Sequence, residues 1–216
     1  MVKKVYNYTS GFTQEEISFF KSFKKPHDIQ LYLNTVAYNP EYITRSPKMI
    51  LHYKQANCFE GALFAAAALR FLGYKPLIVD MMAVNDDDHV ITVFKKNNRW
   101  GAVAKSNTTL LRFREPVYKT LRELVMSYFE FYFNTLGDKS LRSFSNPVNL
   151  EKFDKHNWMA TENDLDFIGD YLFEIKHKEI YPSSSRSINK ADKEVMEICF
   201  SGAVAQGLFV PKETKS

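Results

Sequence analysis

The sequence predicts an α+β protein in which a buried helix packs on a small antiparallel sheet, with further helices on both sides. Three observations lead to this class: an apolar segment with helix start and stop signals at 57–73, strand-like runs between 76 and 104, and amphipathic segments that flank this region. With 216 residues and 45% hydrophobic residues, the chain suffices for one substantial core. We therefore expect a single domain over 1–216, whose central part covers about 50–110.

Two short helices are expected before residue 40. A capping-box pattern at Thr13 predicts a helix that reaches about Phe23. Asp28 begins a second helix, which ends at Asn39-Pro40. The segment 41–56 has no regular pattern, so we expect irregular chain there.

The central helix contains the most informative residue of the chain. Asn57 is a good N-cap, Glu60 has the position of a capping-box acid, and Gly73 is a stop signal. Cys58 is then the first helical residue. A thiol there feels the partial positive charge of unpaired backbone N–H groups, which favours a thiolate and hence a nucleophile near neutral pH.

Strand signals follow at 76–84, 89–94 and 100–104, and Lys96–Arg99 has the composition of a hairpin turn. His89 opens the second of these strands. A nucleophile on a helix and a base on the sheet that follows it have the order of a papain-like cysteine catalyst.

The second half of the chain is predicted to be mostly helical. Apolar and aromatic residues at three-and-four spacing predict a long helix from Pro116 to about Leu136, whose aromatic stripe we assign to core packing. The segment 137–149 has the composition of a loop. A further helix is expected from Thr161, and Pro182–Ser187 is expected to be a mobile connection.

Cysteine usage and charge limit the classes of function. Of the two cysteines, Cys199 lies on the apolar stripe of a closing helix, so we expect no disulfide framework and a reducing compartment. The 29 basic and 25 acidic residues are spread along the chain, which is untypical of nucleic-acid binding. The sequence contains no secretion signal or membrane span, so we expect a cytoplasmic protein without a membrane partner.

Residues 53–107 resemble the transglutaminase-like superfamily, which has a papain-like core. The resemblance is carried by Asn57–Ala62 at the helix start, Leu69–Tyr74 at its end, His89-Val90 on a strand, and Arg99–Gly101 on the hairpin. It implies acyl transfer through a thioester, with Cys58 as nucleophile and His89 as general base. The implied substrate is a peptide or small amide, attacked by hydrolysis or transfer, and no cofactor is required.

The third catalytic position departs from the family pattern. The family's aspartate usually lies about four residues beyond the hairpin tryptophan, where this chain has Ala104. If the strand continues, Ser106 points in the required direction, and if the strand breaks, Asn107 serves through its carbonyl oxygen. Asp87, two residues before His89, is a further candidate.

Other residues are expected to contact the substrate. A tetrahedral intermediate needs donors for its oxyanion, and the side chain of Gln55 or the N–H of Cys58 suits this role. Arg112 and Arg114 share a strand face, on which they form a clamp for a carboxylate or phosphate. The full set of predicted substrate contacts is His52, Trp100, Arg112 and Arg114.

Two alternatives to catalysis remain open, whereas a metal site is not predicted. The acidic run Asn85–His89 has neither a glycine at its bend nor a downstream bidentate acid, so we interpret it as a solvated turn. Ala104 favours a binding module that keeps the fold without turnover. A helical scaffold that docks a partner through aromatic residues at 128–133 is the third interpretation.

Overall fold

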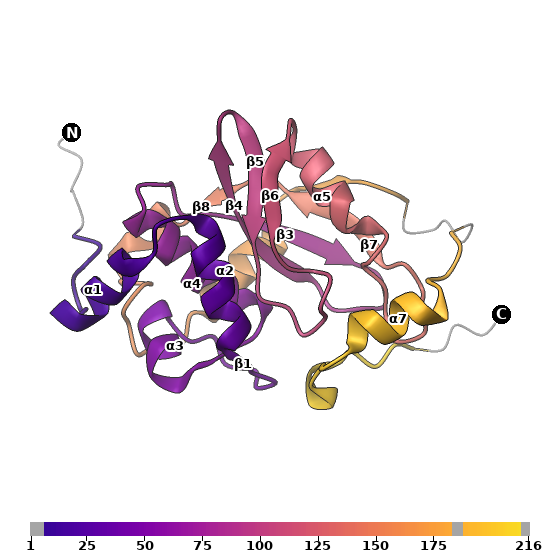
Figure 1. Cartoon of the computed structure of the whole chain (residues 1–216), viewed down its shortest axis with the longest axis horizontal. Coiled ribbons are helices and arrows are strands. Elements are labelled where there is room, and N and C mark those ends of the chain that lie inside the picture. Colours follow the sequence, from indigo (N-terminus) through magenta and orange to yellow (C-terminus); the bar gives the residue numbers. More distant parts are fainter. Residues whose placement is uncertain (1–6, 183–187, 213–216) are drawn as a thin grey trace.

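The computed structural model combines helices with an antiparallel sheet, which confirms the α+β class (Figure 1). The structure describes residues 7–182 and 188–212. Apart from Pro182, the connection predicted at Pro182–Ser187 lies outside these residues. Within them, no helix has the length and apolar character needed to cross a membrane.

A sheet of seven strands forms the centre of the molecule and is larger than the small sheet predicted. Its order is β6-β5-β4-β3-β7-β9, with β8 beside the first part of β3, and all neighbouring strands are antiparallel. The strands are β3 (Leu77–Ala83), β4 (His89–Lys96), β5 (Arg99–Val103), β6 (Arg114–Tyr118), β7 (Leu141–Ser145), β8 (Val148–Asn149) and β9 (His177–Glu179). A separate parallel pair joins β1 (Ala37–Tyr38) to β2 (Gln55–Ala56).

The three predicted strands correspond to β3, β4 and β5, but the loop predicted at 137–149 was wrong. It contains β7 and β8. Apolar and polar residues alternate only briefly in these strands, which include serine and arginine, so no apolar run predicts them. Pairing with β3 supplies the hydrogen bonds and burial that this local sequence does not predict.

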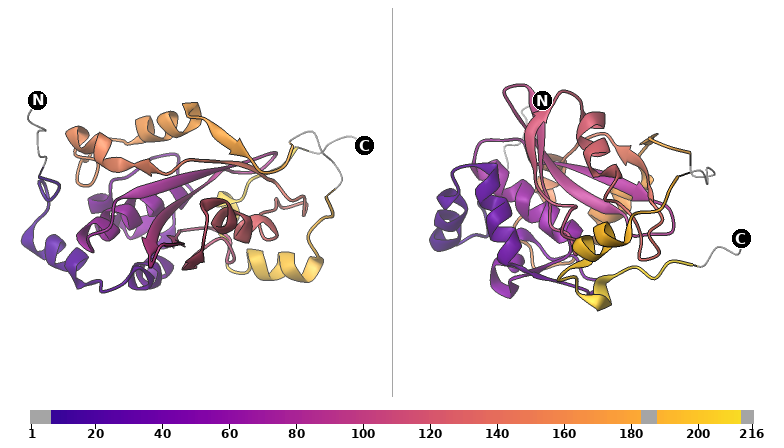
Figure 2. Two further views of the ribbon diagram at one scale, coloured as in Figure 1. Left: turned by 90° about the horizontal axis from the view of Figure 1, so that it is seen from above. Right: turned by 45° about the vertical axis from the view of Figure 1, so that its right-hand side comes forward.

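The described part of the chain contains seven α-helices. They are α1 (Gln14–Ser22), α2 (Pro26–Thr35), α3 (Pro47–Tyr53), α4 (Cys58–Phe71), α5 (Leu121–Phe129), α6 (Asp166–Glu174) and α7 (Lys193–Phe200). Two 3₁₀ helices, η1 (Leu150–His156) and η2 (Ala205–Gly207), complete the elements. Figure 2 shows α1 to α4 gathered at one end of the molecule and α7 at the other.

Three helix predictions need correction. The irregular segment expected at 41–56 contains α3, which begins with Ser46 as N-cap and Pro47 in its first turn. The helix expected from Pro116 to about Leu136 covers only Leu121–Phe129. Pro116 lies in strand β6, and the residues after Phe129 fold back through turns and a bridge to Lys139. Helix α6 starts at Asp166 and not near residue 161. The side chain of Thr161 accepts from the N–H of Asn163 in the preceding loop, and that of Asp164 accepts from the N–H of Asp166.

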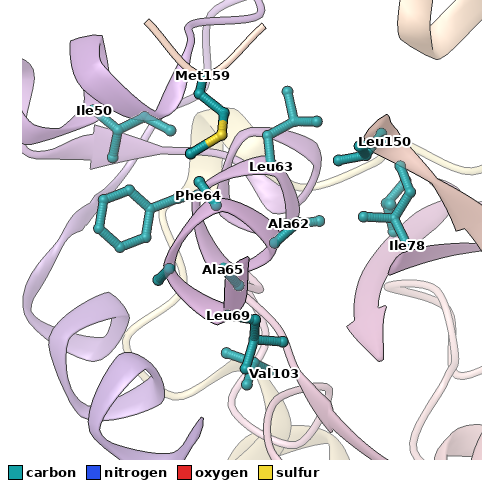
Figure 3. Packing of buried hydrophobic residues seen from close by; sticks show 14 of the residues in the cluster. Ile50, Ala62, Leu63, Phe64, Ala65, Leu69, Ile78, Val103, Leu150 and Met159 are labelled. Atoms are coloured by element: carbon teal, nitrogen blue, oxygen red, sulfur yellow. The ribbon is translucent and has the colours of Figure 1, made fainter. Parts of the chain in front are cut away.

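Helix α4 is the buried element that the sequence predicts. Its residues Ala62–Leu69 are fully buried, and they pack between α1 to α3 and one face of the sheet (Figure 3). Thr92 on β4 donates its hydroxyl to the carbonyl oxygen of Ala62 at 2.6 Å, which joins the strand to the helix. The small residues of α4 allow this close approach of helix and sheet.

The two faces of β4 belong to different layers. Val90 and Phe94 belong to the core around α4, whereas Ile91 and Val93 belong to a second core, which includes residues of α5. Since side chains alternate along a strand, His89 points to the same side as Ile91. Cys58 and His89 therefore lie on different sides of the sheet and approach each other only at its end.

Candidate functional site

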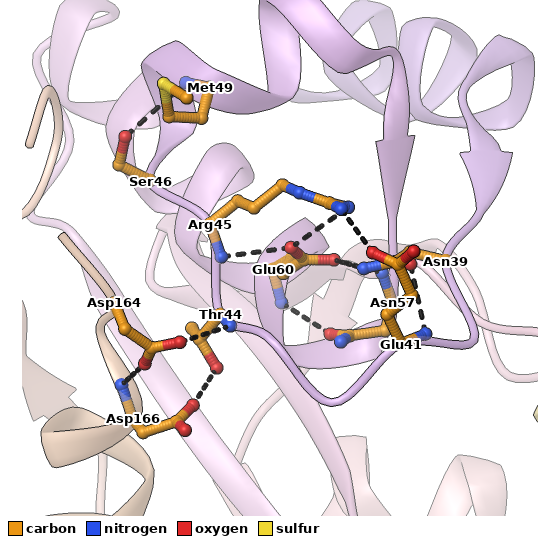
Figure 4. Close-up of polar contacts among 10 residues, drawn as sticks. All are labelled: Asn39, Glu41, Thr44, Arg45, Ser46, Met49, Asn57, Glu60, Asp164 and Asp166. Carbon is orange, nitrogen blue, oxygen red and sulfur yellow. Dashed lines mark hydrogen bonds and ion pairs between the residues drawn. The ribbon is translucent and has the colours of Figure 1, made fainter. Parts of the chain in front are cut away.

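The start of α4 has the predicted capping box. The side chain of Asn57 accepts from the N–H of Glu60 at 2.9 Å, and the carboxylate of Glu60 accepts from the N–H of Asn57 at 2.8 Å. Glu60 is fully buried and also accepts from Asn39 and from the N–H of Arg45, each at 3.0 Å (Figure 4). This network fixes the backbone on which Cys58 is the first helical residue.

The Cys58 thiol is held in a neutral state. Burial raises its pKa to about 11, and the charge of Asp87 adds to this effect, whereas the N–H groups of Val90 and Phe59 lower the pKa. The thiol lies 3.8 Å from the carbonyl oxygen of Asp88, to which it donates. In this arrangement burial outweighs the field of the helix start, which favours the thiol over the thiolate expected near neutral pH.

His89 is buried and neutral. Burial lowers its pKa to about 4, and its Nε2 atom lies 3.0 Å from the carbonyl oxygen of Leu111. A carbonyl only accepts, so this contact assigns the proton of the neutral ring to Nε2 and leaves Nδ1 with a lone pair. The ring packs edge-on against Tyr132, with centroids 6.4 Å apart.

Cys58 and His89 line one cavity of about 70 Å³, which is enough for several water molecules. Within the described residues, however, neither ring nitrogen of His89 makes a hydrogen bond to the Cys58 sulfur. Tyr132 lines the same cavity, and its ring contacts His89. The structure thus brings the two predicted residues to one cavity without joining them.

The acidic turn forms another wall of this cavity. Asp86, Asp87 and Asp88 all line it, and burial raises the pKa of each, that of Asp86 to about 6. Ser140 donates to the carboxylate of Asp86 at 2.6 Å. Asp87 and Asp88 are exposed and Asp86 is half-buried, so the turn is solvated along most of its length, as expected. Among the described residues, no group of three or more His, Cys, Asp or Glu is placed to hold a metal ion.

None of the three candidates for the third catalytic position bonds to His89. Ser106 shares a hydrogen bond with Thr108 at 3.0 Å, and Asn107 binds both backbone groups of Val204. Both line the cavity, as Asp87 does, but the partner of His89 is the carbonyl of Leu111. The expected roles of Ser106, Asn107 and Asp87 as orienting residues are therefore wrong for this arrangement.

Two predicted contacts lie away from the cavity because of their places on α3 and β2. His52 is exposed on α3 and bonds to Glu16 at 2.9 Å. Gln55 is exposed on β2, where its backbone pairs with Ala37, and it lines neither of the cavities that contain Cys58. The oxyanion role predicted for the Gln55 side chain does not fit this position.

Trp100 lies at the wrong end of the sheet for substrate binding. It pairs with Lys95 beside the hairpin, whereas His89 begins β4 at the opposite end. The ammonium of Lys95 covers the Trp100 ring at 4.5 Å. The tryptophan therefore stabilises the hairpin.

The predicted arginine clamp does not form. The Arg114 guanidinium lies 3.9 Å from the ring centroid of Tyr128 and donates to the Ser127 side chain and to the Leu110 carbonyl. Arg112 precedes β6 and reaches the carbonyl oxygen of Ser106 at 3.5 Å. Both side chains thus bind the protein's own backbone, and we withdraw them as a clamp for a carboxylate or phosphate.

Sequence reasoning missed a buried hydrogen-bonded pair, Asp80 and His177. The carboxylate of Asp80 lies 2.9 Å from Nε2 of His177, and His177 donates through Nδ1 to the carbonyl of Ile175 at 2.8 Å. The charge of Asp80 contributes to the raised pKa of Cys58. The signal present in the sequence is an aspartate within the apolar run of β3, because a buried carboxylate requires a partner.

Comparisons with known proteins identify no family. No family model matches the chain, and no curated protein is significantly similar to it in sequence. The interpretation of the site therefore depends on its residues and geometry.

Proposed function

We propose that this protein is a cysteine-dependent enzyme of the transglutaminase-like type, which hydrolyses or transfers an amide or peptide bond through a thioester. One observation carries the proposal: the Cys58 thiol, on the first residue of a buried helix, and the neutral His89 ring line the same cavity. Nδ1 of that ring has a free lone pair, because the proton of the neutral ring is assigned to Nε2. A thiol and an unprotonated imidazole nitrogen are the two groups that nucleophilic acyl transfer requires.

In the proposed reaction, the Cys58 side chain rotates from the Asp88 carbonyl toward Nδ1 of His89. The sulfur attacks the carbonyl carbon of the substrate while Nδ1 takes the thiol proton. Backbone N–H groups at the start of α4 stabilise the oxyanion, and His89 then returns the proton to the leaving amine. Water or a second amine then attacks the thioester carbon while Nδ1 of His89 takes its proton; the C–S bond breaks, and His89 returns the proton to the Cys58 sulfur.

The carbonyl of Leu111 has the role that an orienting side chain has in related catalysts. It holds Nε2–H, so the other ring nitrogen is kept as an acceptor, and it stabilises the imidazolium that forms during attack. The starting pair is neutral, because burial raises the pKa of Cys58 and lowers that of His89. The proposed mechanism is therefore general-base catalysis and not attack by a preformed thiolate.

Alkylation by iodoacetamide tests the proposal. We expect the rate at Cys58 between about pH 5 and pH 8 to exceed that of a thiol with a pKa of about 11 and to fall in His89→Ala. Mass spectrometry of each labelled peptide measures Cys58 separately, with the buried Cys199 as internal reference. Equal rates in the wild type and His89→Ala across this range would overturn the proposal.

A binding module without turnover is the second candidate. It is supported by the hydrogen bond of the Cys58 thiol to the Asp88 carbonyl and by Ala104 at the position of the family's usual aspartate. For this candidate, the alkylation profile has a single midpoint near the pKa of about 11 and does not depend on His89. The same experiment thus distinguishes the two.

A further inference from the structure

The end of the described chain crosses the mouth of the Cys58 cavity. We call residues 204–212 the C-terminal strap. Gly207, Leu208 and Phe209 line the cavity together with Cys58. The same three residues, with Gln206 and Val210, form one wall of an adjoining hollow of about 560 Å³, which also includes Cys58. The strap thus lies between the cavity and this hollow, and we call the site that it occupies there the groove. In Figure 1 this part of the chain follows α7; its beginning lies toward β1, and the rest runs back past α7.

Two asparagine side chains hold the strap near its ends. Asn107 donates to the carbonyl of Val204 at 2.9 Å and accepts from its N–H at 2.8 Å. Asn85 makes the same pair of bonds to Lys212, at 2.9 and 2.8 Å. Each amide satisfies both backbone groups of one residue, as a neighbouring strand would. The two asparagines therefore bind the backbone of the strap and not its side chains.

Between these two contacts, the strap passes close to an aromatic ring. A Cβ atom added to Gly207 would lie 2.4 Å from Cε1 of Tyr38. A side chain larger than hydrogen therefore does not fit while the strap is seated. Beyond this point the carbonyl of Phe209 accepts from the Thr135 hydroxyl at 3.5 Å.

The strap is attached by few interactions. None of its residues is buried, and 85% of Val210 is exposed. Its hydrogen bonds to the rest of the protein come mainly from Asn85 and Asn107. A segment with little buried apolar surface opens at low free-energy cost, so the strap is suited to leave the groove.

We propose that the groove beside Cys58 binds an extended polypeptide, and that the strap is an intramolecular occupant which a polypeptide substrate replaces. The preferred occupant has a glycine against Tyr38 followed by an apolar pair, as Gly207, Leu208 and Phe209 do. The two asparagine amides provide backbone recognition. This inference names the substrate class of the proposed enzyme and so rests on the proposed function.

Peptide binding tests the inference. The probe is a fluorescent peptide with the sequence of residues 203–212, and a second peptide has valine in place of its glycine. In full-length Gly207→Val, the strap is expelled and the groove is free. We expect this variant to bind the first peptide about tenfold or more tightly than the wild type, because a filled groove lowers apparent affinity. The valine peptide is expected to bind neither protein.

Access to Cys58 gives a second measurement. Asn85→Gly removes one amide contact while keeping the positive φ of 52° at this position. Asn98→Gly is the matched control, because Asn98 has a φ of 58° in an exposed hairpin turn. We expect iodoacetamide to label Cys58 faster in Asn85→Gly and Gly207→Val than in the wild type or Asn98→Gly. The first peptide should slow labelling of Gly207→Val.

The outcomes separate this inference from the proposed function. Equal affinity of the wild type and Gly207→Val for the first peptide, or no binding by either, overturns the inference. If circular dichroism shows that Gly207→Val does not fold, the rate at which iodoacetamide labels Cys58 in Asn85→Gly is the test. A rate equal to that of Asn98→Gly overturns the inference. If the peptides bind as expected but the labelling rate of Cys58 does not depend on His89, the polypeptide-binding groove is supported and the proposed enzymatic function is contradicted.

Discussion

The Nε2 atom of His89 lies 3.0 Å from the carbonyl oxygen of Leu111, so the main chain orients the candidate base. Both groups are placed by tertiary structure: His89 begins β4, and Leu111 lies in the chain between β5 and β6. A backbone carbonyl is present in every residue type, so substitution of Leu111 does not remove the acceptor. This explains how the ring is held without an aspartate at the position of Ala104.

The protonation state of His89 is the first prediction. We expect the neutral ring to carry its proton on Nε2 and to titrate with a pKa of about 4, because burial disfavours the imidazolium. Long-range ¹H–¹⁵N correlation spectra of the ring nitrogens measure both properties. A proton on Nδ1 at neutral pH, or a midpoint at the ordinary value of 6.5, would contradict the assignment.

The same burial predicts a loss of stability in acid. The folded pKa of His89, about 4, is below the unfolded value of 6.5, so the unfolded chain binds more protons between these values. Stability from this group is therefore complete above pH 6.5 and decreases as the pH falls toward 4, by at most about 3 kcal/mol. His89→Gln lacks the titration. Urea unfolding of both proteins at several pH values isolates the difference; parallel curves would refute the prediction.

Two helical glycines give a matched pair of stability predictions. A Cβ atom at Gly61 would lie 2.1 Å from Cβ of Lys105, whereas one at Gly169 would make an ordinary contact of 3.4 Å with Phe59. Overpacking at Gly61 outweighs the helix propensity of alanine, so we expect Gly61→Ala to lower the free energy of unfolding by about 2 kcal/mol. Gly169→Ala should raise it by up to about 1 kcal/mol. Thermal or urea unfolding measures both changes in the free energy of unfolding. Equal changes in the two variants would contradict the close approach of Gly61 to Lys105.

Local sequence signals predict local structure here, but not the partners that meet across the fold. The start of α4 follows from Asn57 and Glu60, because a capping box is complete within four residues. The partner of His89 is a main-chain atom of Leu111, and sequence patterns do not mark which carbonyl a ring will meet. The strands of 137–149 depend on pairing with β3, which is likewise non-local.

Asp80 and His177 also form a contact that local sequence does not predict. The two residues are separated by 97 positions, yet their side chains meet at 2.9 Å. Burial raises the pKa of Asp80 from 3.8 to about 6, against the hydrogen bond from His177. Since the folded pKa is the higher one, the stability that Asp80 contributes is complete below pH 3.8 and is lost as the pH rises toward 6.

Asp80→Asn removes this titration and keeps a side chain that hydrogen-bonds to His177. We expect the stability of the variant relative to the wild type to increase as the pH rises from about 4 to 6, with Asp138→Asn as a more exposed control. The Asp80 charge also raises the pKa of Cys58, so alkylation of Cys58 in Asp80→Asn should shift to lower pH. An unchanged alkylation profile would mean that Asp80 stabilises the fold without acting on the thiol, and would remove this pair from the description of the site.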